Sequence, residues 1–325
     1  MGAHIDAAAA LTSHGRRRPN ARRLADAAAR ACLARAGREA GDIDMLINAG
    51  VYREDHLGEP ALAALVQEDI GANLGQPPVG GHGTFSFDLA NGTCGVISAL
   101  KLQAGLLRSG VIKLGLIVAS DVDPNPKESL SAPIQPTGGA VLLSWDDSIA
   151  GFTDFYSETF PEYAGMLVSG LMWRPGRGLR ASPTAAGESR LVIRERPGYL
   201  ARCVDCAEEA TRRFLARLGM DIADIDLLVP APAAPEFLDS LRVRLGVPGD
   251  RVSFTGEDMA GAYTAGTIAA LEVATKSGRL TEARNTLLLA VGAGITVTLA
   301  LYRQTPPEAE HEGPDLARGQ DSAHE

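Results

Sequence analysis

Apolar and polar positions along the chain form two patterns that alternate. Continuous apolar runs at 114–119 and 287–291 contain no charged side chain, which is typical of central strands covered by helices on both faces. Each run follows a stretch that opens with small residues and continues at helical spacing, ending near Gly110 or Gly278. This alternation predicts a layered α/β protein.

A self-match indicates that the chain contains two related halves. Residues 33–37 and 42–47 recur at 215–219 and 224–229, with the same offset for both segments and no gap between them. Each copy is typical of an amphipathic helix that ends at a glycine, followed by an Asp-Ile-Asp turn and a buried strand. A weaker echo relates residues 93–100 to 264–271. We therefore predict an internally duplicated α/β fold.

The pattern also predicts how the chain is divided. The first half is expected to span residues 1–187, including loops at 121–136 and 174–187 that are rich in Pro, Ser, Gly and charged residues. The second half is expected to span residues 188–304. Residues 305–325 are charged and almost free of large apolar side chains, so we predict a disordered acidic tail.

Composition narrows the classes of function. The formal net charge of −9 and the sequence pI of about 5.3 argue against a nucleic-acid partner, because phosphate binding relies on clustered Lys and Arg. No stretch reaches the roughly 18 apolar residues that a membrane helix needs. The four cysteines are too few for a disulfide framework in a chain of this length. We expect a cytoplasmic protein that does not bind a membrane.

No motif in the sequence predicts a metal or a cofactor. Cys203 and Cys206 have C-x-x-C spacing, but they lie within a predicted helix and no second Cys or His pair follows. No glycine-rich phosphate loop follows a strand. We therefore expect neither a metal site nor a bound cofactor.

The segment 87–96, Phe-Asp-Leu-Ala-Asn-Gly-Thr-Cys-Gly-Val, resembles the nucleophile elbow of ketoacyl-ACP synthase III. Further stretches match that family in order, among them 137–143, Val229-Pro230 and the Gly-Ala-Gly turn at 292–294. The resemblance covers about residues 20–303. It implies a thiolase-like fold of two α/β halves in α-β-α-β-α layers, acyl transfer from an acyl thioester, and dimers that pair through the strand near the elbow.

The residues that the resemblance implies for catalysis are largely replaced. The family's nucleophilic Cys, five positions after the Asp, corresponds to Thr93, and a thiol follows one residue later at Cys94. Its His in Val-Pro-His corresponds to Ala231, and its Asn in Gly-Asn-Thr-Ser corresponds to Ala262. No histidine lies between residues 82 and 311. The turn formed by Gly292, Ala293 and Gly294 could still supply a backbone oxyanion donor.

Two features keep acyl-transfer chemistry open. Cys94 is expected at a helix N-terminus, where the helix dipole stabilises a thiolate; the alternative is a small buried side chain. Glu59 precedes a Pro and resembles the base that crosses the dimer interface in the olefin-forming, head-to-head condensing branch; the alternative is a carboxylate that caps a helix. His56, His82 and Glu257 are further candidates for a base.

Two functions are consistent with these residues. The first is a ketoacyl-ACP synthase III-like acyltransferase of specialised lipid or polyketide metabolism, acylated on Cys94, with Glu59 reaching across a dimer. Thr93 is a further catalytic candidate because of its position. The second is a non-catalytic partner of an active ketosynthase paralogue. Only residues 1–20 precede the first predicted helix, so we expect the thioester to be acyl-ACP rather than acyl-CoA. Docking of an acyl carrier protein would need a local basic patch, for which Arg23, Arg242 and Arg244 are candidates.

Overall fold

The computed structural model describes residues 2–13, 19–53, 59–75, 83–123, 134–147, 150–174, 188–231, 235–253 and 261–304. Nine strands of this part form one sheet in the order β3-β2-β4-β5-β1-β6-β11-β10-β9. Their bounds are β1 Gly2–Thr12, β2 Met45–Asn48, β3 Phe85–Asp88, β4 Leu114–Asp121, β5 Thr137–Asp146, β6 Gly151–Thr159, β9 Leu227–Pro230, β10 Asn285–Gly292 and β11 Thr296–Arg303. The predicted α/β class is confirmed.

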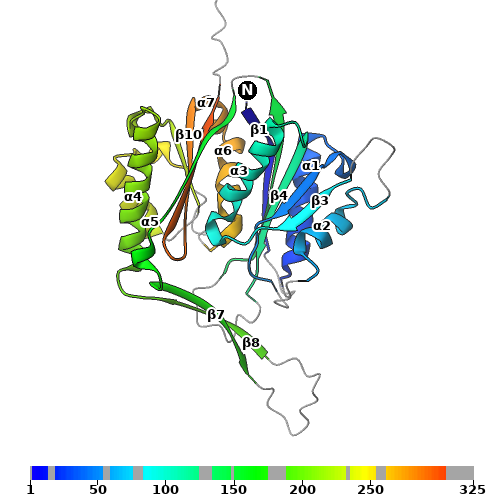
Figure 1. The fold of residues 1–325 in the computed structure, drawn as a ribbon, viewed down its shortest axis with the longest axis horizontal. Helices are drawn as coiled ribbons and strands as arrows, with labels where there is room; N and C mark the ends of the chain where they lie inside the picture. The colour runs from blue at the N-terminus through cyan, green and yellow to red at the C-terminus, as the bar shows by residue number, and fades with distance from the viewer. Residues whose placement is uncertain are drawn as a thin grey trace, which may run out of the picture.

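The helices divide the fold into layers (Figure 1). Helices α3 (Gly95–Arg108) and α6 (Gly266–Lys276) lie in the centre and pack against strands of both halves. Helices α1 (Ala21–Ala36) and α2 (Leu62–Ile70) cover the outer face of the first half. Helices α4 (Tyr199–Arg217) and α5 (Pro235–Leu245) cover that of the second. The short helix α7 (Arg279–Glu282) follows α6. This is the α-β-α-β-α arrangement that the resemblance implied.

The duplication is visible element by element. Strands β2 and β9 begin and end at the offset of the self-match, as predicted. The second echo extends further, because its offset also relates β4 to β10 and the 3-10 turn η2 (Gly92–Cys94) to the turn η7 (Tyr263–Ala265). In both halves the turn leads directly into a central helix. Helix α1 ends at Gly37, whose φ of 62° lets its N–H bond back to Leu33 and Ala34.

The pairing of the strands indicates where the first half of the chain ends and the second begins. Strand β6 precedes the predicted division at residue 187, yet it pairs along its length with β11 of the second half. Strand β1 joins the two sets, since it pairs with β5 and, through Ala3 and Phe152, with β6. The division at 187 therefore stays a prediction, and by pairing the second set of strands starts at β6. The predicted tail 305–325 lies outside the described residues.

A separate ribbon interrupts the second half. Strands β7 (Leu167–Arg174) and β8 (Glu188–Glu195) pair only with each other among the described strands, and in Figure 1 they project away from the layered body. The ribbon falls at the predicted loop 174–187, most of which lies outside the described residues. The body and the candidate site are formed without it.

The core is close-packed where β5 meets the helices on its two faces. A Cβ atom added at Gly138 would overlap the backbone carbonyl of Leu24 in α1, and one at Gly139 would lie 3.0 Å from Ile268 in α6. Backbone cannot move aside as a side-chain tip can. Strand β5 therefore needs glycine to be held between α1 and α6.

This packing predicts a matched pair of glycine substitutions. Gly138→Ala should lower the free energy of unfolding by at least about 1–3 kcal/mol, because overpacking a core forces backbone shifts. Gly105→Ala, on the exposed side of α3 with nothing within 4 Å of the added atom, should raise it by about 0.5–1 kcal/mol through helix propensity. Urea unfolding of both variants measures these free energies. An unchanged free energy of unfolding for Gly138→Ala would contradict the close packing of β5 against α1.

Candidate active site

The predicted elbow is formed as strand, tight turn and helix. Strand β3 ends at Asp88, whose carboxylate accepts hydrogen bonds from the backbone N–H groups of Leu62 and Ala63, each at 2.8 Å, at the start of α2. Gly92 follows with a φ of 51°, a left-handed conformation that favours glycine. Helix α3 then starts at Gly95. The Phe-Asp pair of the motif thus anchors α2 beside the elbow.

Thr93, which the resemblance assigns to the position of the family nucleophile, is half-buried. Its hydroxyl donates a short hydrogen bond to the carbonyl oxygen of Val291 in β10. The bond ties the first half's elbow to the second half's last strand pair. A hydroxyl held in this way needs a strong neighbouring base to act as a nucleophile.

Cys94 is fully buried in the core between the halves. Its Sγ atom lies 3.4 Å from the carbonyl oxygen of Thr296 and 3.8 Å from that of Ala290. Burial raises the pKa of this thiol to about 11, although the neighbouring hydroxyls of Thr298 and Thr93 act in the opposite direction. The thiol therefore stays protonated at neutral pH, against the expectation of a thiolate stabilised by the helix dipole. Its role as a nucleophile remains a prediction that this geometry disfavours.

The two positions that the resemblance assigns to the family His and Asn carry buried methyl groups. Ala231 follows β9 and its N–H donates to the carbonyl of Leu289 at 2.7 Å, while Ala262 is completely buried next to η7. Among the described residues the one histidine is His4, whose Nδ1 lies 3.0 Å from the Tyr302 hydroxyl on β11. The described part of the site thus contains no imidazole and no side-chain amide at these two places.

The Gly-Ala-Gly turn lies directly beside the elbow. Gly292 is buried, and a Cβ atom added to it would lie 3.1 Å from the Sγ atom of Cys94 and 3.6 Å from the Thr93 hydroxyl. Ala293 is exposed, and Gly294 adopts a left-handed φ of 75°. The turn is close enough to residue 93 for a backbone donor, and its oxyanion role stays a prediction.

Asp121, which the sequence reasoning did not identify, connects three segments of the site. It is buried at the end of β4 and accepts four hydrogen bonds. Two come from the N–H groups of Val51 and Tyr52, at 2.9 and 2.7 Å, and two from the N–H and hydroxyl of Thr264 in η7. Burial raises the pKa of this carboxyl, while the hydrogen bonds lower it. The signal that the sequence offered for Asp121 was a charged residue at the end of an apolar run that predicts a buried strand.

Two aromatic residues also escaped the sequence reasoning. The rings of Tyr52 and Tyr263 lie 5.2 Å apart between centroids. The Tyr263 hydroxyl lies 3.4 Å from the point where a Cβ of Gly92 would be. A tyrosine directly after Ala262, in a turn otherwise built from small residues, was the available signal.

The remaining candidate bases lie next to or outside the described residues. Glu59 is exposed and lies shortly before α2 begins at Leu62, and its role as a base stays a prediction. His56, His82 and Glu257 lie outside the described residues. The described residues contain no group of three or more potential metal ligands, and all four cysteines are buried and unpaired with one another.

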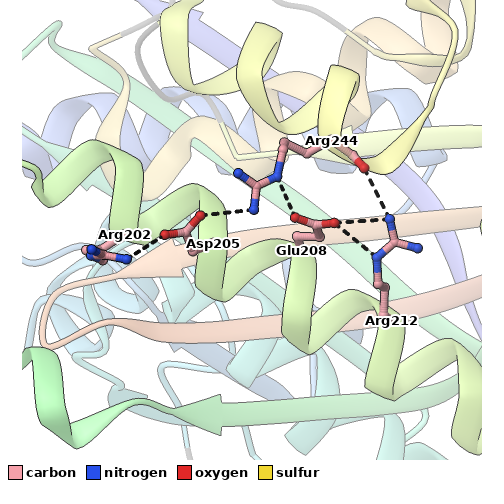
Figure 2. Close-up of polar contacts among 5 residues, drawn as sticks. All are labelled: Arg202, Asp205, Glu208, Arg212 and Arg244. Atoms are coloured by element: carbon pink, nitrogen blue, oxygen red, sulfur yellow. Dashed lines mark hydrogen bonds and ion pairs between the residues drawn. The ribbon is translucent and has the colours of Figure 1, made fainter.

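The candidate docking arginines of the second half are engaged in ion pairs. Figure 2 shows Arg244 of α5 bound to both Asp205 and Glu208 of α4, at 3.0 and 2.6 Å, with Arg202 and Arg212 binding the same two carboxylates. Arg242 lies 3.6 Å from Asp239. The network holds α5 to α4 and pairs Arg244 with two carboxylates. Because both are already engaged in ion pairs, Arg242 and Arg244 are poor candidates for docking an acidic carrier.

Comparisons with known proteins agree with this geometry. The family model for the C-terminal part of 3-oxoacyl-(acyl-carrier-protein) synthase III matches residues 215–304. Beta-ketoacyl-(acyl-carrier-protein) synthase III of Alkalilimnicola ehrlichii is 27% identical over 289 residues, covering 86% of this chain and 83% of the relative.

Solved structures share the fold. Ketoacyl-ACP synthase III from Thermus thermophilus has a TM-score of 0.75 at 23% identity, covering 93% of this chain and 99% of its own. Xanthomonas campestris OleA has a TM-score of 0.73 at 16% identity, covering 93% and 98%. The fold and the elbow define a thiolase-like protein. Within that class, the chain is similar to ketoacyl-ACP synthase III proteins along most of its length.

No helix of the described part is both long and apolar enough to cross a membrane.

The contact between the sulfur of Cys94 and Gly292 predicts a coupled pair of substitutions. Gly292→Ala should lower the free energy of unfolding by about 1–3 kcal/mol, because the added methyl meets Sγ at 3.1 Å. Cys94→Ala in the same chain removes the obstacle. The double variant should therefore recover stability, with a coupling of at least about 0.5 kcal/mol in a double-mutant cycle measured by urea unfolding. Strictly additive losses would mean that the thiol points elsewhere.

Proposed function

We propose that this chain is a member of the ketoacyl-ACP synthase III family that does not perform the condensation itself and acts as the thiolase-fold partner of an active ketosynthase. The observation that carries the proposal is the set of side chains at the three reaction positions. They are a hydroxyl that is hydrogen-bonded to backbone, at Thr93, and two buried methyl groups, at Ala231 and Ala262.

Magnitudes favour this function over condensation. General acid–base catalysis by a positioned side chain contributes typically about 10²–10⁴-fold, and loss of a single oxyanion donor costs about 10²–10³-fold. Two methyl groups supply neither effect. The one thiol near the elbow among the described residues, Cys94, is buried and has a pKa of about 11, so only a very small fraction is thiolate at pH 7.

The edge of the sheet offers a surface for the partner. Strand β3 is an outermost strand and pairs only with β2 among the described strands. Phe85 on this strand is 63% exposed and its ring lies 5.5 Å from that of Phe87. Unpaired backbone groups next to exposed aromatic rings favour association with another chain. The family resemblance implies pairing through this same strand, with either a second copy or a paralogue.

A second candidate function is acyl transfer by the chain itself, in lipid or polyketide metabolism. The observation in its favour is that Thr93 is half-buried rather than buried and lies beside the Gly292–Gly294 turn. Glu59 would then act as the base, on an acyl-ACP or acyl-CoA substrate. This candidate requires the protein to become acylated.

Mass spectrometry separates the two candidates. After incubation with acyl-ACP or acyl-CoA, we expect no mass increment and, with malonyl-ACP, no ketoacyl product, because residue 93 lacks a thiol and a base. An increment that disappears in Thr93→Ala or Cys94→Ala would overturn the proposal and support the acyltransferase. A ketoacyl-ACP synthase III that retains its Cys, His and Asn serves as the positive control for each donor.

The partner role predicts a charge-sensitive edge. Co-expressed with a Cys-containing paralogue from the same organism, the chain should form a heterodimer whose condensation activity exceeds that of the paralogue alone. Phe85→Lys should reduce heterodimer formation at least tenfold, because it buries a charge at the interface. Val243→Lys, an exposed apolar position on α5, is the matched control. Size-exclusion chromatography with light scattering measures the heterodimer fraction of both variants. Equal heterodimer formation by Phe85→Lys and Val243→Lys would contradict pairing through β3.

A further inference from the structure

Tyr263 has a backbone conformation that a bulky residue rarely adopts. Its φ is 42°, and positive φ in a non-glycine residue costs on the order of 1–2 kcal/mol. The residue begins η7, which the second echo relates to η2, so that Tyr263 corresponds to Gly92 with its φ of 51°. The duplicated turn thus requires the same unusual backbone in both copies. The first copy uses glycine, and the second keeps a large aromatic residue there despite the strain.

The strained backbone directs the Tyr263 side chain at the other copy of the turn. Its hydroxyl lies 3.4 Å from the position that a Cβ atom of Gly92 would occupy. The next residue along the chain is Thr93, where the family's acyl group would be attached. The ring is supported from one side by the ring of Tyr52, 5.2 Å away. Burial and the neighbouring Tyr52 hydroxyl raise the pKa of Tyr263, so the phenol stays neutral.

One buried carboxylate holds both tyrosines in position. Asp121 binds the N–H group of Tyr52 itself and, on the other side, the N–H and hydroxyl of Thr264, which directly follows Tyr263. The N–H of Val122 also donates to the carbonyl of Tyr52 at 3.0 Å. These bonds fix the backbone at Tyr52 and directly after Tyr263, so the two rings project from anchored positions and lie 5.2 Å apart.

We propose that Tyr263, supported by Tyr52, covers residue 93 and is the specificity-determining residue that keeps acyl thioesters away from the elbow. An attacking atom and a carbonyl carbon must come within about 3–3.5 Å of each other, and the phenol lies against the residue adjacent to that approach. The inference deepens the proposed function and rests on it in one respect: a covered elbow is useful to a chain that leaves condensation to its partner.

A thiol placed at residue 93 tests the cover directly. In a Cys94→Ala background, Thr93→Cys supplies a reporter whose alkylation by iodoacetamide is followed by mass spectrometry. We expect slow labelling, faster by at least tenfold after Tyr263→Gly, which installs the residue that the first repeat has at this place and relieves the positive φ. Tyr263→Phe keeps the ring and should stay slow. Cys32, Cys203 and Cys206, all buried, are internal controls that should remain unlabelled in each variant.

Equilibrium binding supplies a readout that needs no new thiol. Decanoyl-CoA should bind the Tyr263→Gly chain at least tenfold more tightly than the natural chain or Tyr263→Phe, as measured by calorimetry. Rapid alkylation of the residue-93 thiol with Tyr263 in place would overturn the proposal that Tyr263 covers this residue. So would a Tyr263→Gly chain that shows neither faster alkylation nor tighter binding of decanoyl-CoA. Such a result leaves the proposed function standing, because that function is tested separately by acylation of the natural chain and by stimulation of the paralogue.

Discussion

The contact between the elbow of the first repeat and the last strand pair of the second is the constraint on which the site depends. The hydroxyl of Thr93 binds the carbonyl of Val291, and a Cβ atom added at Gly292 would lie 3.1 Å from the sulfur of Cys94. Neither repeat could form this arrangement alone. Because the two sides are in van der Waals contact, a change in residue size on either side must be accommodated by the other.

This contact also explains why a thiol one residue from the nucleophile position is not equivalent to the nucleophile. Thr93 and Cys94 lie in the 3-10 turn η2, where adjacent residues point in directions about 120° apart, since a 3-10 helix has about 3.0 residues per turn. Thr93 therefore stays half-buried at the elbow, while Cys94 turns toward β10 and β11 and enters the core. The helix dipole favours a thiolate by roughly 1 kcal/mol or less in most settings, whereas burial here raises the pKa to about 11.

The sequence predicted features that depend on local or repeated patterns. The self-match between the halves predicted β2 and β9 with matching bounds, and the glycine that terminates α1 was identified at Gly37. The turn and helix start at residues 88–95 were likewise predicted from the sequence, while the assignment of Ala231 and Ala262 to the family His and Asn positions stays a prediction. The direction of the Cys94 side chain was not, because it depends on contacts with strands of the other half of the chain. Asp121 and the Tyr52–Tyr263 pair were missed for the same reason, since each joins segments that only the tertiary fold brings together.

The central position of β1 affects how the chain can assemble. Residues 2–12 pair with residues 137–146 of β5 on one side and meet β6 on the other, so the middle of the sheet is closed by a strand synthesised long before its neighbours. Contacts between residues so far apart in sequence incur the loop-closure entropy before they gain any pairing energy, and they slow folding. Until β5 emerges from the ribosome, β1 has two unpaired edges, and its run of alanines (Ala7 to Ala10) offers little apolar surface for aggregation during that wait.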